Sequence, residues 1–171
     1  VRCGGGAGRA AQGVSIESFL AERALLAKAA PFEFRLRHLQ AERARHVIQV
    51  AARMSNWASR GVGADGQGLG IGFGRYKNRA AYCAVVIDVQ VEQDVKVRRV
   101  WAAVDAGAIV HRDGLMNQIE GGIIQALSWS LKESVSWNAD GLTSNTWDAY
   151  PNLNFDDVPE AKSPLSTSAT D

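Results

Sequence analysis

Long apolar runs, paired cysteines and an excess of one charge sign are all missing from this sequence of 171 residues. No run approaches the roughly 18 apolar residues that a membrane-spanning helix needs, so we expect no membrane span. The two cysteines, Cys3 and Cys83, lie far apart without a C-x-x-C pair, which argues against a zinc site and a disulfide scaffold. With 19 basic and 18 acidic residues the net charge is +1, so no broad electrostatic field favours nucleic acid.

The composition that remains is typical of an ordinary globular domain, with 46% hydrophobic and 22% charged residues. The Gly- and Ala-rich residues 1–14 are expected to be flexible, and the polar residues 161–171 are expected to be disordered. The region between them, residues 15–160, is expected to form one domain.

Three helices are predicted before residue 58. The segments "SIESFLAERALLAKAA" and "ERARHVIQVAARMSNW" have apolar residues at i, i+3 and i+4, which indicates one buried stripe on each helix. Between them, Pro31 suits the first turn of "PFEFRLRHL" because its missing N–H has no partner there. The predicted stripes are Ile16, Phe19, Leu20, Ala24 and Ala27 on the first helix, and Ala44, Val47, Ile48, Ala51 and Met54 on the third.

Residues 59–78 carry a glycine at almost every second position and are expected to form a loop that leads into a strand. Within them "GVGADG" matches G-x-G-x-x-G, but a helix precedes it and more glycine follows. A dinucleotide-binding glycine loop needs a strand before it and a helix after it. The context therefore argues against nucleotide binding at this motif.

A β-hairpin is predicted next. The segment "YCAVVIDVQVE" alternates with period two, with Val85, Ile87, Val89 and Val91 on one face and the polar Asp88 on the other. After the turn "EQDV", the segment "KVRRVWAAVDAG" returns as a second strand. The pair Arg98–Arg99 breaks its alternation and indicates a β-bulge.

The segment "DGLMNQIEGGIIQALSWSLKE" is predicted to be an amphipathic helix with two adjacent glycines in its middle. Each glycine costs about 1 kcal/mol relative to alanine. Gln118, Gly121, Gly122 and Gln125 share one face of this helix, next to an apolar face of Met116, Ile119, Ile123 and Leu127. Two interpretations are open: the glycines admit a closely packed neighbouring backbone, or they leave the backbone bare for a polar ligand that the amides bind.

The stretch "VDAGAIVHRDGLMNQIEGGIIQALSWSLKE" resembles the second molybdopterin-binding region of the xanthine oxidase and aldehyde oxidoreductase family, in its bacterial isoquinoline 1-oxidoreductase β-subunit type. The segments "IESFLAE", "PFEFRLRHL", "RYKNRAAYCAVV" and "TSNTWDAYPNLNFDDVPE" match in the same order, across nearly all of residues 15–160. The resemblance implies an α+β fold with N-terminal helices, a hairpin-based sheet and the glycine-containing helix packed on it. Residues 15–160 are then a partial molybdopterin-binding domain.

The resemblance also implies a cofactor and partners. Gln118 matches a family glutamine that reaches the pterin, so Gln118, Gly121, Gly122 and Gln125 become the candidate cofactor-binding residues. The implied cofactor of the complete enzyme is molybdenum–molybdopterin, in its cytosine dinucleotide form, which family enzymes use to hydroxylate an aldehyde or N-heterocycle with oxygen from water. The implied partners are the remainder of the molybdopterin subunit and an iron–sulfur subunit, in the cytoplasm or periplasm of bacteria.

Two departures from the family pattern limit what this chain is expected to do alone. The catalytic glutamate of the family lies in a Gly-Glu motif that does not occur in these residues, so we assign no catalytic residue and no metal ligand. The sequence is expected to be a C-terminal fragment that neither turns over substrate nor binds the cofactor tightly by itself. Asp105 matches the turn before the helix, and His111, in place of a family asparagine, is expected to be a solvated loop residue.

Two other interpretations of the same sequence stay open. One is a non-catalytic interaction module, indicated by Trp129, Trp137 and Trp147, since tryptophan is enriched at interfaces. The other is a truncated fragment without a function of its own, which would leave apolar surface uncovered.

Overall fold

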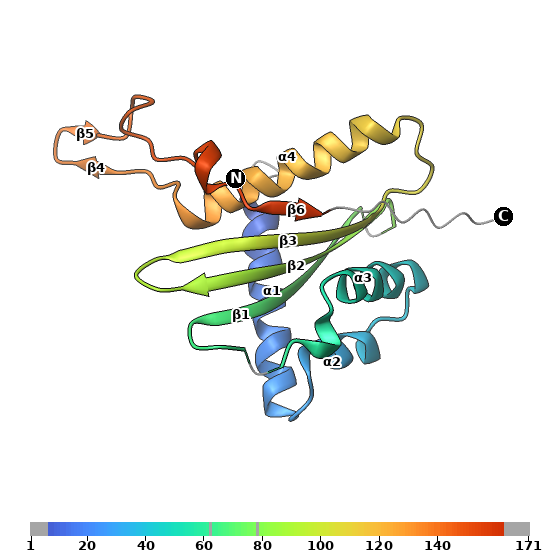
Figure 1. The fold of residues 1–171 in the computed structure, drawn as a ribbon. Helices are drawn as coiled ribbons and strands as arrows, with labels where there is room; N and C mark the ends of the chain where they lie inside the picture. The colour runs from blue at the N-terminus through green and yellow to red at the C-terminus, as the bar shows by residue number, and fades with distance from the viewer. Residues whose placement is uncertain (1–6, 62, 78, 163–171) are drawn as a thin grey trace.

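The computed structural model describes residues 7–61, 63–77 and 79–162, so the prediction that residues 1–14 are flexible falls partly outside them. Helices precede a four-stranded sheet, and a fourth long helix follows its third strand (Figure 1). The α+β class predicted from the sequence is therefore confirmed. The elements are α1 (Ala7–Leu26), α2 (Pro31–His38), α3 (Glu42–Met54), η1 (Trp57–Ser59), β1 (Gln67–Tyr76), β2 (Ala81–Val91), β3 (Val95–Asp105), α4 (Arg112–Leu131), β4 (Trp137–Asn138), β5 (Gly141–Leu142), η2 (Phe155–Asp157) and β6 (Glu160–Lys162).

The sheet has the strand order β1-β2-β3-β6. Strand β2 pairs antiparallel with both β1 and β3, and β6 pairs parallel with β3. The predicted bulge is present: Asp88 pairs with Arg99 and Val89 pairs with Val97, so Arg98 is the extra residue. Strand β6 includes Ala161 and Lys162, the first two residues of the tail 161–171 that was predicted to be disordered. The parallel pairing with β3 holds these two residues, a long-range contact that their polar local sequence did not indicate.

One face of the sheet packs against α3 and forms the main core. The predicted stripe on α3 is confirmed, because Ala44, Val47, Ile48 and Ala51 are buried and Met54 packs beside them. Burial alternates along β2, so Ala84 and Val86 reach this core. Val85 and Ile87 lie on the other face of the strand. The sheet residues of the core include Tyr82, Ala84, Val86, Trp101 and Ala103.

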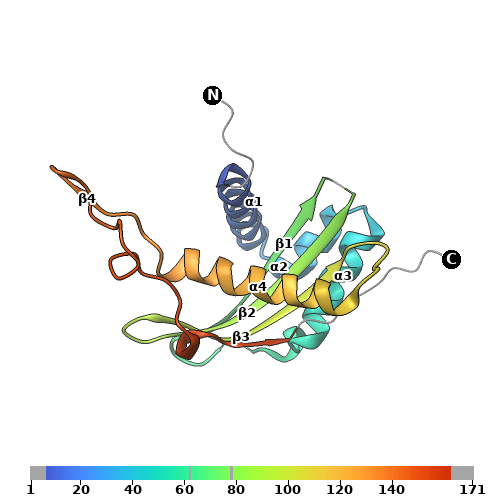
Figure 2. The same cartoon turned by 90° about the horizontal axis from the view of Figure 1, so that it is seen from above.

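Helices α1 and α4 lie on the side of the sheet away from α3 (Figures 1 and 2). On β3 the residues Val100, Ala102 and Val104 alternate with the core residues and are also buried. The predicted apolar face of α4 is only partly sheltered on this side: Leu127 is buried, whereas Ile119 and Ile123 are half-buried. Helix α4 is therefore most sheltered near its C-terminal end, at Leu127 and Ser128, and Gln118, Gly121, Gly122 and Gln125 are exposed.

Helix α1 differs from its prediction in two ways. It begins at Ala7 rather than Ser15, because the alanines before Ser15 are good helix formers and extend the helix backwards. Its predicted apolar stripe is mostly exposed, with Ile16 at 59% and Phe19 at 61%, while Ala24 is fully buried. The Glu17 carboxylate anchors the helix instead, since it accepts hydrogen bonds from Arg35 at 2.5 Å and from the Phe73 N–H at 2.9 Å.

No helix in the described ranges is long and apolar enough to cross a lipid bilayer.

Cys83 provides a test of this packing, because burial raises the pKa of its thiol from 9.0 to about 11. In a Cys3→Ser variant, we expect iodoacetamide to alkylate native Cys83 at pH 8 roughly a hundredfold more slowly than in the unfolded chain, because only the thiolate reacts. Folding favours the protonated thiol, so this group lowers stability as the pH rises between 9 and 11. Mass spectrometry of the alkylated chain against time measures the rate, and equal rates in native and urea-unfolded protein would contradict the burial.

Candidate functional site

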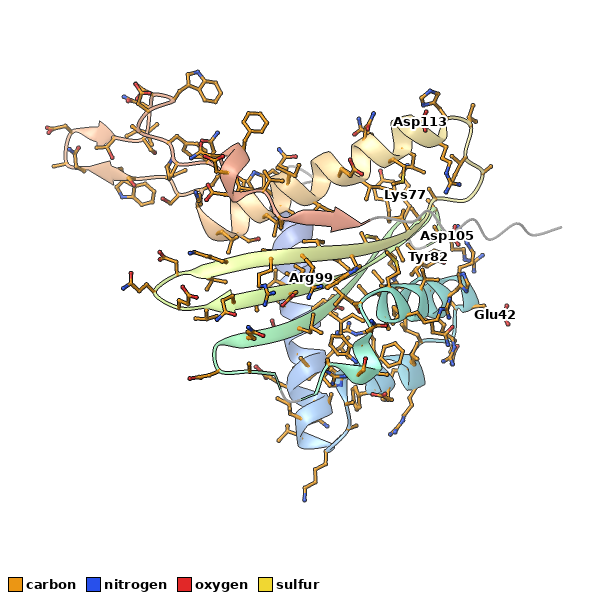
Figure 3. The ribbon with its side chains drawn as sticks, in the orientation of Figure 1. Glu42, Lys77, Tyr82, Arg99, Asp105 and Asp113 are labelled. Atoms are coloured by element: carbon orange, nitrogen blue, oxygen red, sulfur yellow. The ribbon has the colours of Figure 1, made fainter. Side chains whose placement is uncertain are left out.

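Asp105 fixes the turn that connects the sheet to α4. Its carboxylate is fully buried and accepts two hydrogen bonds from the Arg43 guanidinium, at 2.9 Å from Nε and 2.7 Å from Nη2. The Gly107 N–H donates to the same carboxylate at 3.0 Å, with Gly107 at a φ of +73° that a side chain rarely adopts. Figure 3 shows Asp105 and Tyr82 together at the end of the sheet beside α3. This geometry favours a structural role for Asp105 over contact with a cofactor.

Helix α4 starts with a side-chain cap that the sequence interpretation missed. His111 is exposed, as expected for a loop residue, but its Nδ1 accepts a hydrogen bond from the Gly114 N–H at 2.8 Å. This bond satisfies one of the N–H groups that the first turn of a helix leaves without a partner. The signal for it is weak, because histidine is not among the residues preferred at that position.

The glycine face of α4 is exposed. Gln118, Gly121, Gly122 and Gln125 lie on one open surface, so the structure brings the four candidate residues together there. A Cβ atom built at Gly121 or Gly122 meets nothing within 4 Å. No described segment packs closely against these glycines, which removes the packing explanation within this part of the chain.

A hollow of about 530 Å³ lies on this face of α4. The segment that follows β5 closes one side of it, because the Leu153 N–H donates to Ser128 Oγ at 3.0 Å and the Tyr150 hydroxyl donates to Glu133 at 2.6 Å. An ion pair between Lys132 and Asp157 ties the same segment to the end of α4. The lining residues are Asn117, Gln118, Gly121, Gly122, Ile124, Gln125, Ser128, Glu133, Asn152 and Leu153.

The hollow is rich in neutral amides. Four of its lining residues, Asn117, Gln118, Gln125 and Asn152, carry both donors and acceptors. The one lining carboxylate, Glu133, accepts the Tyr150 hydrogen bond, and this bond is the main cause of the raised pKa of Tyr150. Such a surface suits a polar heterocycle with mixed donors and acceptors, and it offers no obvious general acid or base.

No group of three or more His, Cys, Asp or Glu residues in the described ranges is placed to hold a metal ion.

Sequence reasoning found one wall of this hollow and missed the other. The i, i+3, i+4 spacing places the glutamines and glycines on one helix face without any tertiary information. Asn152 lies far along the chain, in a segment without regular periodicity, and only the contacts with Ser128 and Glu133 bring it to α4. Arg43 was also missed, because a charged residue next to an apolar stripe normally faces solvent.

Comparisons with known proteins agree on one family. The family model described as "molybdopterin cofactor-binding domain" matches residues 7–159. A match with 34% identity over 159 residues is to a nicotinate dehydrogenase chain of Pseudomonas putida, and it covers 84% of this chain and 13% of that protein. A match with 37% identity over 149 residues is to the β-subunit of isoquinoline 1-oxidoreductase of Brevundimonas diminuta, and it covers 84% of this chain and 19% of that protein. The chain thus spans less than a fifth of the length of either relative.

Among solved structures, the chain resembles quinoline 2-oxidoreductase from Pseudomonas putida 86 with a TM-score of 0.49 and 24% identity. That match covers 52% of this chain and 12% of the other.

Proposed function

Because this chain belongs to the molybdopterin cofactor-binding domain family, we propose that α4 forms one wall of the cofactor site in an oxidoreductase. Gln118 and Gln125 would bind the polar edge of the pterin, while Gly121 and Gly122 would let it approach the helix backbone. The observation that carries the proposal is the open glycine face, where a Cβ atom built at either of two residues that are costly in a helix would meet nothing within 4 Å.

The residues present fit such a group. The hollow beside the glycines has room for one heterocyclic ring system, and amides line two sides of it. Pterin edges alternate hydrogen-bond donors and acceptors. A side-chain amide can bind either kind of group, because its carbonyl oxygen accepts and its NH2 group donates. The glycine positions leave free the space that any Cβ would occupy.

The reaction that we propose for the complete enzyme is hydroxylation of an aldehyde or an N-heterocycle with oxygen from water. The cofactor, proposed to be the cytosine dinucleotide form, would supply the redox chemistry, and the protein would supply binding and orientation. The curated relatives are named for nicotinate and isoquinoline, two N-heterocycles, which supports the N-heterocyclic class for this chain.

We propose that the chain acts with the remainder of a molybdopterin subunit and with an iron–sulfur subunit. It spans 13% and 19% of its curated relatives, so most of such an enzyme lies in sequence that these residues do not include. The family's catalytic Gly-Glu motif is not among them, so we expect no turnover from the chain by itself. Exposed apolar residues on α1, including Phe19 at 61% and Leu26 at 74%, are surfaces that the remainder would cover.

A Gln118→Ala change tests the proposal. We expect it to lower the molybdenum content of the complete enzyme, produced in a host that makes the cofactor, about fivefold to tenfold, the effect of about one lost hydrogen bond. Elemental analysis of the purified protein measures the ratio of molybdenum to chain. The matched control is Gln40→Ala, since Gln40 is an exposed glutamine outside the hollow.

The interaction-module alternative has a specific observation in its favour, because Trp137 and Trp147 are 74% and 90% exposed. It predicts a different result for the same experiment. A module without a cofactor role would keep its partner chains, and Gln118→Ala would leave the molybdenum content equal to that of Gln40→Ala.

A further inference from the structure

A second hollow, of about 750 Å³, lies at the other face of the sheet from α4. The segment after α3 forms one side of it, and the β2–β3 hairpin with the start of β1 forms the other. It shares no lining residue with the hollow at Gln118. The lining residues are Met54, Ser55, Asn56, Ser59, Arg60, Gly61, Gly63, Gln67, Gly68, Leu69, Asp88, Arg98, Arg99 and Trp101.

The β-bulge brings two consecutive arginines to this hollow. In a regular strand Arg98 and Arg99 would point to opposite faces of the sheet. The extra residue in β3 breaks that alternation, and both residues line the same hollow. Bulges commonly re-aim side chains in this way next to binding sites.

Aromatic rings contact the guanidinium groups of Arg60 and Arg99, and a carboxylate also binds that of Arg99. The Arg60 guanidinium lies 4.1 Å from the centre of the Trp57 ring and donates to the Trp57 carbonyl at 2.9 Å. The Arg99 guanidinium lies 5.1 Å from the Trp101 ring and donates to Asp88 Oδ2 at 2.8 Å and 3.1 Å. Contacts of this kind limit the motion of the side chain and leave its other N–H groups available.

The charge of the hollow is positive. Three arginines, Arg60, Arg98 and Arg99, face a single carboxylate, Asp88, which is 6% exposed and paired with Arg99. Arg98 is exposed, and its side chain makes no hydrogen bond or ion pair with another described residue. Figure 3 shows Arg99 beside the paired strands. The unneutralised guanidinium groups would therefore attract an anion into a concave site.

We propose that this hollow binds a small molecule that carries a diphosphate group. Arginine presents several N–H donors in a planar fork that matches phosphate oxygens, and two or three such forks suit neighbouring phosphates. Its volume lies within the range of small-molecule sites, about 300–1,000 Å³. The inference goes beyond the proposed cofactor role of α4 and does not rest on it, because the two hollows lie on different faces.

Two independent features support a small ligand over an acidic protein segment. The site is a hollow rather than a flat patch, and the exposed residues Gly61 and Gly63 lie at one rim, where they have no side chain to exclude a compact ligand. A Cβ at Gly63 would lie 2.7 Å from the Gln67 carbonyl oxygen, so only glycine fits at this position.

Titration of the purified full chain with inorganic pyrophosphate tests the inference. Trp101 lines the hollow and Trp57 stacks on Arg60, so intrinsic tryptophan fluorescence reports on binding, and calorimetry gives the stoichiometry. We expect saturable binding at one site. Arg98→Gln and Arg60→Gln should each weaken it roughly tenfold or more, the effect of losing charge-assisted hydrogen bonds. The matched control is Arg75→Gln, which removes the same charge from the exposed far end of β1.

Each outcome decides the inference. Binding that is weakened by both variants and unchanged by Arg75→Gln supports it, provided that circular dichroism shows all variants folded. Equal weakening by all three variants would reveal a non-specific charge effect and would overturn it. So would the absence of saturation at millimolar pyrophosphate, or binding of a hexaglutamate peptide in its place. Molybdenum content does not enter this readout, so failure here leaves the proposal for α4 intact.

Discussion

Replacing Arg43 by alanine is expected to lower the free energy of unfolding by about 3 kcal/mol, because it leaves the Asp105 carboxylate buried without its counter-charge. Asp105 is fully buried, and Arg43 supplies two of its hydrogen bonds. The estimate takes the lower end of the range for broken buried pairs, since the Arg43 side chain is 32% exposed and water can partly replace it. Thermal unfolding followed by circular dichroism should show a melting temperature lower by roughly 6–12 °C.

The matched control is Arg53→Ala, an arginine near the end of the same helix that makes no ion pair with a described residue, which we expect to be nearly neutral. A second variant separates the charge from the packing. Adding Asp105→Asn to Arg43→Met removes both charges and should recover part of the loss, because no unpaired buried charge remains. Equal melting temperatures for Arg43→Ala and Arg53→Ala would show that the pair does not hold the turn before α4.

Replacing Gly122 is expected to separate stability from cofactor binding. Gly122→Ala should raise the free energy of unfolding of the chain by about 1 kcal/mol, because alanine is the better helix former and its Cβ meets nothing within 4 Å. Gly122→Leu should place a branched side chain in the hollow and lower the molybdenum content of the complete enzyme by at least about tenfold, as expected for a ligand displaced from its site. Melting curves of the chain give the first quantity, and elemental analysis of the complete enzyme gives the second.

The control for the leucine variant is Ala126→Leu, one helical turn further on. Ala126 is exposed on α4 but does not line the hollow. If both leucine variants lower the molybdenum content equally, the effect comes from a change in the helix surface in general. If Gly122→Ala destabilises the chain, the glycine is needed for the fold itself, and the structural explanation of the glycine pair is wrong.

The sequence by itself determined the elements whose signal is local. The stripe of α3 follows from its 3.6-residue period, and α2 begins at Pro31 as predicted. The hairpin and its bulge follow from alternation and from the Arg98–Arg99 interruption. The face shared by Gln118, Gly121, Gly122 and Gln125 also needs only helical geometry, which fixes the direction of each side chain from its position in the chain.

Other features depend on contacts between segments that are distant in the sequence. The apolar pattern of α1 predicted a buried stripe, yet Glu17, rather than Phe19, anchors the helix, because the element that covers a face is decided by the arrangement of the whole sheet. Along β2 the fully buried face carries Ala84, Val86 and the polar Asp88 rather than the apolar set of Val85 and Ile87, because α3 packs on that face.

Both hollows were beyond the reach of local patterns for the same reason. The hydrogen bonds of Leu153 and Tyr150 bring Asn152 to α4, and Arg60 lines the same hollow as Arg98 although the two residues lie far apart in the sequence. Periodicity assigns a side chain to a face of its own element. Periodicity contains no information on which residue of another element will contact that face. That contact depends on how the packed elements together exclude water and pair buried charges.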